Sequence, residues 1–69
     1  MENKERFISA IETALIMYSR ERIESIRYKT TESGLELAVI TFTDKNTIVQ
    51  DITGDSCIAI MHDLWRALQ

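Results

Sequence analysis

The sequence predicts a small α+β domain in which a helix, a three-stranded antiparallel meander and a second helix follow one another. Two observations predict this order. Residues 4–21 and 56–68 repeat apolar side chains at helical spacing, and residues 23–53 hold three strand-like runs separated by short polar turns. Short turns join antiparallel neighbours, and two terminal helices can cover one face of a small sheet. We therefore expect an α-β-β-β-α chain with both helices packed on one face of the sheet.

Residues 4–21 are expected to form the first helix, with Asn3 as its N-cap. At about 100° per residue, most apolar side chains fall on one broad arc. The arc comprises Phe7, Ile8, Ala10, Ile11, Ala14, Leu15, Met17 and Tyr18. Ile16 is the exception, because it projects from the polar side of the same helix.

Residues 23–30, 35–43 and 47–53 are expected to be the strands. The middle run is apolar on both faces, since side chains alternate along a strand. If both hairpins align the alternating side chains of their strands in the same sense, which we call matching parity, one face of the sheet forms the core under the helices. That face carries Ile26, Tyr28, Ala38, Ile40, Phe42, Ile48 and Ile52, and the outer face carries Leu35, Leu37, Val39 and Val49. A slip of one residue in the first turn would instead move Ile26 and Tyr28 to the outer face.

Both hairpin turns contain a residue that tolerates a positive φ. In the first, residues 31–34, Gly34 can adopt a positive φ. The second is predicted as a three-residue loop, residues 44–46, with Asn46 in the left-handed conformation. This loop would pair Phe42 with Ile48.

Gly54 ends the third strand, and either Asp55 or Ser56 is expected to cap a second helix running to about Leu68. Its apolar arc consists of Cys57, Ile58, Ile60, Met61, Leu64, Trp65 and Leu68. As in the first helix, this arc predicts the face that packs on the sheet.

Length and composition describe a single small domain, residues 1–69, that is 45% hydrophobic. The lone Cys57 excludes an internal disulfide, and with His62 as the only histidine a structural zinc site is not expected. Domains of this size are marginally stable, so the remaining routes to stability are good packing and self-association.

The formal net charge of −3 offers no electrostatic footprint for nucleic acid or an anionic membrane. Mixed charges in residues 1–6, followed by Glu12, argue against a signal peptide or a membrane span. A single thiol suits a reducing compartment, so we expect an acidic cytoplasmic protein.

We predict no catalytic, cofactor-binding or metal-binding residues, and therefore no enzyme. His62 has no orienting carboxylate at helical spacing, and Cys57 lies on the apolar arc five residues before it. The turn before the second helix resembles a phosphate-binding helix start, but it has no Lys and carries Asp55.

The α-β-β-β-α order resembles that of the double-stranded RNA-binding domain. The resemblance covers the order of elements along the whole chain. In that family a basic cluster at the start of the second helix contacts RNA, and here that segment, residues 55–59, contains no Lys or Arg. Because phosphate contacts dominate nucleic-acid affinity, RNA binding is only a third functional alternative.

The leading functional hypothesis is a non-enzymatic protein-interaction module. An apolar sheet face rimmed by charge is typical of an interaction surface, and closed dimers are the commonest soluble oligomers. The predicted homodimer interface comprises Ile16, Leu35, Leu37, Val39 and Val49. The second alternative is a monomeric adaptor or inhibitor that docks the same face on another protein.

Overall fold

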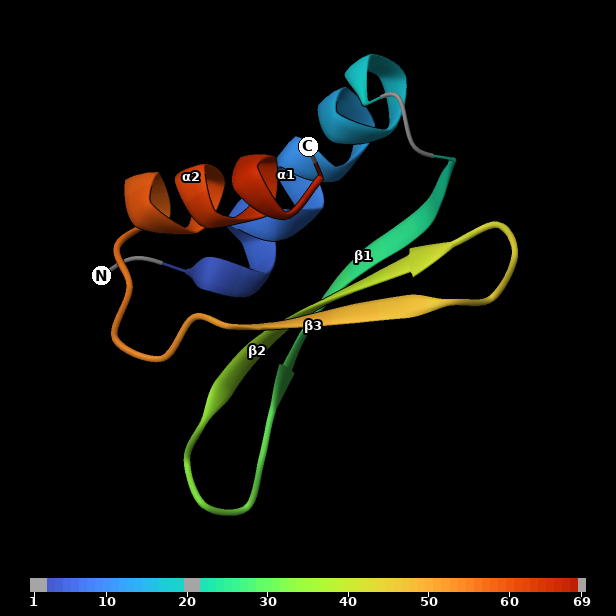
Figure 1. Ribbon diagram of the computed structural model, residues 1–69. Coiled ribbons are helices and arrows are strands. Elements are labelled where there is room, and N and C mark those ends of the chain that lie inside the picture. The colour runs from blue at the N-terminus through green and yellow to red at the C-terminus, as the bar shows by residue number, and fades with distance from the viewer. Residues whose placement is uncertain (1–2, 20–21, 69) are drawn as a thin grey trace.

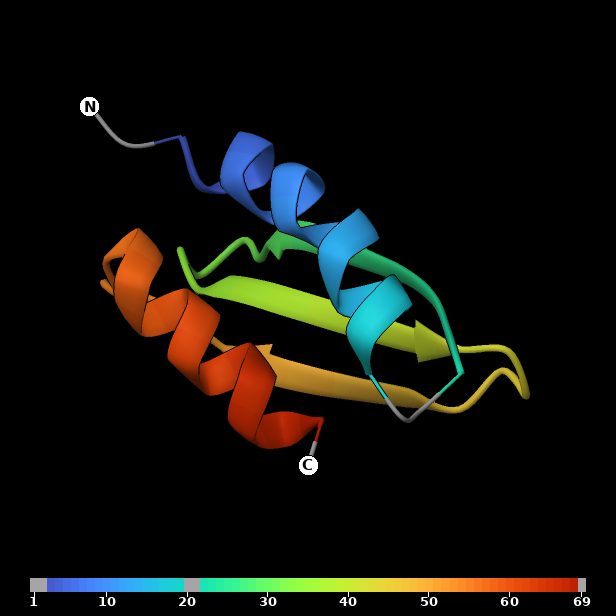
Figure 2. The same ribbon diagram turned by 90° about the horizontal axis from the view of Figure 1, so that it is seen from above.

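The computed structural model describes residues 3–19 and 22–68. The elements are α1 (Lys4–Tyr18), β1 (Ile23–Thr30), β2 (Glu36–Phe42), β3 (Thr47–Asp51) and α2 (Cys57–Ala67). The strands form one antiparallel sheet in the order β1-β2-β3. Both helices lie on the same side of it, as Figures 1 and 2 show. The predicted α+β fold is confirmed.

Both helices begin with side-chain caps. Asn3 Oδ1 accepts a hydrogen bond from the backbone N–H of Arg6 at 3.0 Å, as predicted. For α2 the cap is Ser56, whose Oγ accepts from the N–H of Ala59 at 3.2 Å. The first helix is shorter than predicted, because the backbone at Ser19 is already extended. Residues 20 and 21 of the predicted helix lie outside the described residues.

The core lies between the helices and one face of the sheet. The register pairs Ile26 with Ile40 and Ile40 with Ile48, so these side chains share the helix-facing side. This confirms the predicted parity of the first hairpin. The buried residues are Ile8, Leu15, Ile23, Ile26, Ala38, Ile40, Ile52, Ile60, Leu64 and Leu68. The partly buried Tyr28, Phe42 and Ile48 pack against them.

Ile23 joins this core through an irregularity in β1. The register shifts between Ile23 and Ser25, and Ile23 is only 5% exposed. A bulge adds one residue to one strand, so the side chains before it change faces. Strict alternation along the sequence therefore does not predict that Ile23 is buried.

The second hairpin differs from its predicted register by two residues. Ile40 pairs with Ile48, and the N–H of Phe42 donates to the carbonyl of Asn46 at 2.9 Å. The loop is therefore residues 43–45, and Lys45, not Asn46, has the positive φ of 74°. The cause is local, because Asp44 Oδ1 accepts from the N–H of Asn46 and draws that residue back toward the strand. A shift of two preserves the faces.

Neither helix buries the whole of its apolar arc. Only Ile8 and Leu15 of α1, and Ile60 and Leu64 of α2, are fully buried within the helices. The predicted arcs also contain large side chains that the structure leaves exposed: Met17, Tyr18, Ile58, Met61 and Trp65. A sheet of three strands takes up only a narrow stripe from each helix, so part of each predicted arc remains at the surface.

Polar contacts fix α1 against the edge of the sheet. Glu12 Oε2 accepts from the backbone N–H of Ile26 and from Nη1 of Arg27, both at 2.7 Å. Ile26 belongs to β1, whose outer edge has no neighbouring strand. Glu12 thus satisfies an edge amide that would otherwise need water or another strand.

We predict that Ile40→Ala destabilises the protein by about 2–5 kcal/mol, because it leaves a cavity at the centre of the core. Ile58→Ala is the matched control, since Ile58 is 71% exposed and alanine favours the helix. Urea unfolding of both variants measures the difference. Equal losses for the two substitutions would contradict the assigned core.

Candidate interaction surfaces

The sheet face that points away from the helices has an aliphatic centre. Val39 pairs with Val49 on one side and with Arg27 on the other. In the next row, Leu37 lies between Lys29 and Asp51. Residues directly opposite one another in an antiparallel pair have neighbouring side chains, so these rows form one surface.

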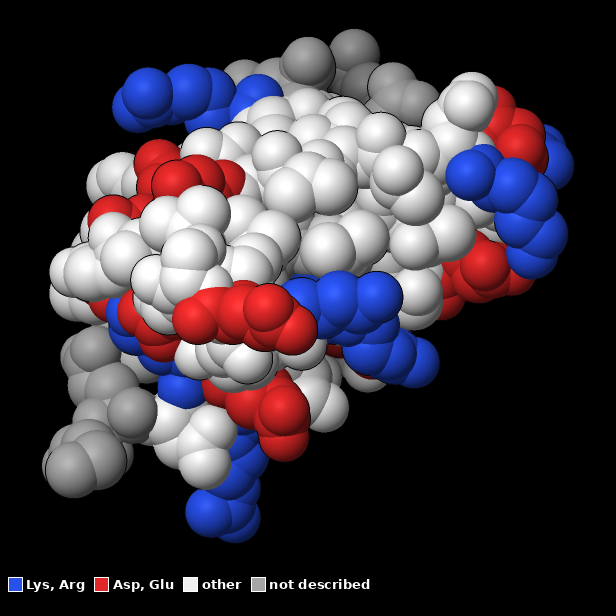
Figure 3. Space-filling view, turned by 90° about the horizontal axis from the view of Figure 1, so that it is seen from below, with Lys and Arg blue, Asp and Glu red and all other residues white. Residues whose placement is uncertain are grey.

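This surface is open to solvent. Val49 is 56% and Leu35 42% exposed, whereas Leu37 and Val39 are half-buried by their neighbours. Figure 3 views the molecule from the sheet side and shows an uncharged area bordered by basic and acidic side chains. The register thus places Leu37, Val39 and Val49 on one face, as the alternation along the strands predicted, and Leu35 lies just before β2.

Ile16, the fifth residue of the predicted interface, lies elsewhere. It belongs to α1, in the helix layer, and is 37% exposed. Both helices lie on one side of the sheet (Figure 1), whereas the register places Val39 and Val49 on its other face. The structure therefore does not bring Ile16 together with the other four residues.

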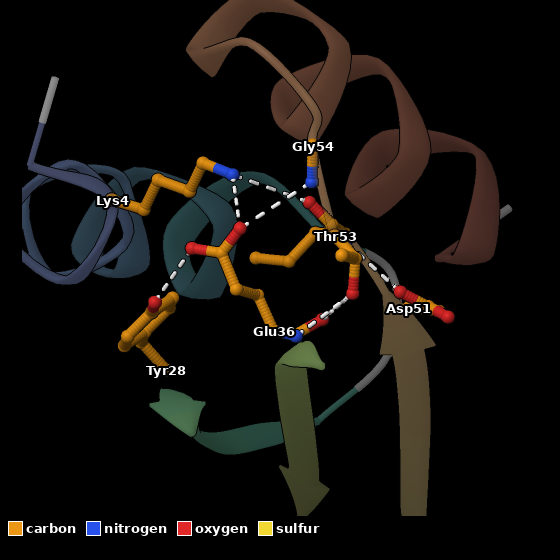
Figure 4. Close-up of polar contacts among 7 residues, drawn as sticks. Lys4, Tyr28, Glu36, Asp51, Thr53 and Gly54 are labelled. Atoms are coloured by element: carbon orange, nitrogen blue, oxygen red, sulfur yellow. Dashed lines mark hydrogen bonds and ion pairs between the residues drawn. The ribbon is translucent and has the colours of Figure 1, made fainter. Parts of the chain in front are cut away.

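Glu36 is the centre of a polar cluster at one end of the sheet (Figure 4). Its Oε1 accepts from Lys4 Nζ at 2.6 Å and from the N–H of Gly54 at 3.3 Å. Its Oε2 accepts from the Tyr28 hydroxyl at 2.7 Å. These partners come from α1, β1 and the loop after β3, so one carboxylate connects three separate parts of the chain.

The same contacts hold Glu36 in its charged form. The hydrogen bonds from Lys4 and Tyr28 lower the pKa of Glu36 from 4.5 to about 2. Conversely, the hydrogen bond to the Glu36 carboxylate raises the pKa of Tyr28. A carboxylate this strongly ionised and already bonded to three donors is a poor proton acceptor. The charge of Glu36 therefore contributes to the stability of the fold.

Two carboxyl groups, those of Asp55 and Asp63, lie close together near the start of α2. A hydrogen bond with Asp63 raises the pKa of Asp55, because one of the two carboxyls must hold a proton to make it. Asp51 has a lowered pKa, since the backbone N–H and side chain of Thr53 both donate to it.

In the described parts of the chain, no three or more His, Cys, Asp or Glu side chains gather to form a metal site.

Cys57 and His62 are the two residues whose side chains could take part in nucleophilic or acid–base chemistry, and both belong to α2. Cys57 is half-buried at the first position of α2, and His62 lies on an exposed side of the same helix. His62 lines a groove between the helices together with Ile11, Ala14, Leu15, Met61, Trp65 and Arg66.

Sequence reasoning missed that groove, although the sequence contained a signal for it. The apolar arcs of both helices span roughly half of the helical wheel, wider than the stripe of about 100° that a core-facing helix needs. Such an excess indicates a second apolar surface. Helical periodicity gives the direction of this second apolar surface relative to the core. It does not predict which other element of the fold lies beside that surface.

Comparisons with models of protein families, with curated proteins and with solved structures gave no match. Within the described ranges, no helix has the length and apolar character needed to cross a membrane.

We predict that Glu36→Gln lowers the midpoint of thermal unfolding by several degrees at pH 7. Because the pKa of Glu36 is lowered on folding, its charge stabilises the fold above about pH 4.5, and this contribution is lost as the pH falls toward 2. The difference between wild type and variant should therefore shrink over that range. Glu32→Gln, in the first hairpin loop, is the control. A difference that stays constant down to pH 2.5 would refute this role.

Proposed function

We propose that this protein is a non-catalytic interaction module that forms a homodimer through its outer sheet face. The observation that supports it is the aliphatic cluster on the face opposite both helices, which comprises Leu35, Leu37, Val39 and Val49. The predicted interface loses Ile16, because that residue belongs to the helix layer.

Covering this face with a second copy would bury aliphatic surface that is otherwise open to solvent. Burying about 300 Å² of aliphatic surface per subunit contributes on the order of 7 kcal/mol before the cost of association. The total stability of a small domain is of the same order. A chain of 69 residues therefore gains substantially by covering the face with a second copy.

The charges around the face are arranged for self-association. Lys29 of β1 and Asp51 of β3 flank Leu37 in one row. A two-fold axis parallel to the strands brings β1 of one copy over β3 of the other. In that arrangement Leu37 meets Leu37, and each Lys29 faces Asp51 of the second copy. Opposite charges then meet at the rim, which favours this orientation.

The chemistry of the chain gives less support to the other functional classes. RNA binding of the kind suggested by the order of elements needs basic residues near the start of α2, where residues 55–59 contain none. Enzyme chemistry needs a nucleophile or base with an orienting partner, and the carboxylate clusters here connect structural elements instead.

We predict that wild-type protein scatters light at about twice the chain mass of 8.0 kDa and that Val39→Lys scatters at the chain mass. The substitution places a charge at the centre of the apolar interface while leaving the helix-covered core intact. Ser33→Lys adds the same charge in a hairpin loop and should leave the dimer unchanged. A wild-type chain that is monomeric at micromolar concentration, or a Val39→Lys variant that is still a dimer, refutes the proposal.

The charge arrangement gives a separate prediction about orientation. Lys29→Glu should weaken the dimer about tenfold, because it faces Asp51 of the second copy with like charge. Adding Asp51→Lys to that variant should restore much of the loss. Sedimentation equilibrium measures the dissociation constants of the wild type, both single variants and the double variant. Purely additive effects would exclude the two-fold axis parallel to the strands.

A further inference from the structure

The larger exposed apolar surface of this protein lies on the helices. Six of the eight large apolar side chains exposed among the described residues belong to α1 or α2. They are Ile16, Met17 and Tyr18 in α1, and Ile58, Met61 and Trp65 in α2. Ile16 is on the polar side of α1, and the other five side chains are each between 43% and 74% exposed. Of these five, Met61 and Trp65 line the groove between the helices.

A groove runs between the two helices within this surface. α1 contributes Ile11, Ala14 and Leu15, and α2 contributes Met61 and Trp65. The groove has a volume of about 480 Å³. Leu15 is buried, whereas Trp65 is 47% exposed, so Leu15 lies deep in the groove and Trp65 stands higher on its wall. Figure 2 looks down on this side of the molecule, where the helices lie next to one another above the sheet.

The shape of the apolar surface points to an elongated occupant. Ile58, Met61 and Trp65 follow one another along one side of α2 at spacings of three and four residues. Ile58 and Trp65 are thus about 10 Å apart along the helix axis, close to two turns. An amphipathic helix presents apolar side chains at the same spacing, and such helices dock into apolar grooves of this kind.

The charge of the groove is opposite to that of the whole protein. Its ionisable lining residues are Arg66 and His62, both on α2, and no Asp or Glu lines it. Within the described ranges Arg66 has no ion pair, since the salt bridges there join Lys4, Arg27 and Lys45 to Glu36, Glu12 and Glu24. The chain as a whole carries a net charge of −3. A cation beside an apolar groove favours an occupant with an acidic flank.

We propose that the groove between α1 and α2 docks one amphipathic helix of another protein, with an acidic side chain of that helix paired to Arg66. A second copy of this chain is a poorer occupant. The described residues form two helices, and both already pack on their own sheet, so in that part of the chain a second copy has no unpacked helix to insert. The groove also opens on the side away from the proposed dimer face. Both sites can therefore be occupied together.

The test uses Trp65, the only tryptophan in the chain, as the reporter. The probe is a designed helical peptide of about 15–20 residues with Leu and Ala on one face and Glu on the flanks. The matched probe has Lys in place of every Glu. The Glu peptide should shift the emission of Trp65 to shorter wavelength with a micromolar dissociation constant. The Lys peptide should bind at least about tenfold more weakly.

Charge reversal at the groove makes the test specific. Arg66→Glu should reverse the preference, so that the Lys peptide binds more tightly. Lys45→Glu changes the net charge equally in the second hairpin loop, where Lys45 pairs with Glu24, and should leave the preference unchanged. Val39→Lys should also bind the Glu peptide as the wild type does, so failure of the dimer proposal and failure of the groove proposal are distinguishable.

Three results would overturn the inference. One is that neither peptide changes the emission of Trp65. Another is that both peptides bind equally and Arg66→Glu has no effect on the preference. The third is that Met61→Lys, and not Val39→Lys, converts a wild-type dimer to monomers, which would make a second copy the occupant of the groove.

Discussion

The parity of two hairpins determines which side chains of this protein meet the helices and which meet solvent. The closing backbone hydrogen bonds, Thr31 to Leu35 and Phe42 to Asn46, each enclose a loop of three residues, 32–34 and 43–45. Each loop ends in a residue with positive φ, Gly34 at 91° and Lys45 at 74°. This common geometry aligns Ile26, Ile40 and Ile48 across the sheet on the helix side. It aligns Arg27, Val39 and Val49 on the other side. The core and the proposed dimer face are therefore two consequences of one register.

The position of α1 depends on two carboxylates as well as on its apolar stripe. Glu36 accepts from Lys4 near the start of the helix, and Glu12, two turns further along, accepts from the edge amide of Ile26. These contacts fix the rotation and direction of α1 relative to the sheet. The core-facing stripe then has Ile8 and Leu15 at its centre, with Phe7 and Ile11 packed beside them, and Ala14 and Tyr18 are left outside it. The groove beside α2 is a result of this placement.

The two proposed surfaces lie on opposite sides of a three-stranded sheet. The sheet face is aliphatic and rimmed by both signs of charge, which suits a second copy of the same chain. The groove between α1 and α2 contains an aromatic and a thioether side chain and has basic residues at its border. Aromatic and Met side chains are enriched in interfaces that accept a partner. The different chemistry of the two surfaces matches two different kinds of partner.

The sequence by itself determined the type and order of the elements, the cap at Asn3 and the apolar alternation of β2. Each of these follows from residues close together in the chain: a side chain beside a free amide, or a period of two or 3.6 residues. The tertiary structure alone decided the burial of Ile23 and the exposure of Met61 and Trp65. Those outcomes depend on contacts between distant segments. A helical wheel gives the direction of an apolar arc, and only the packed sheet decides how much of that arc is covered.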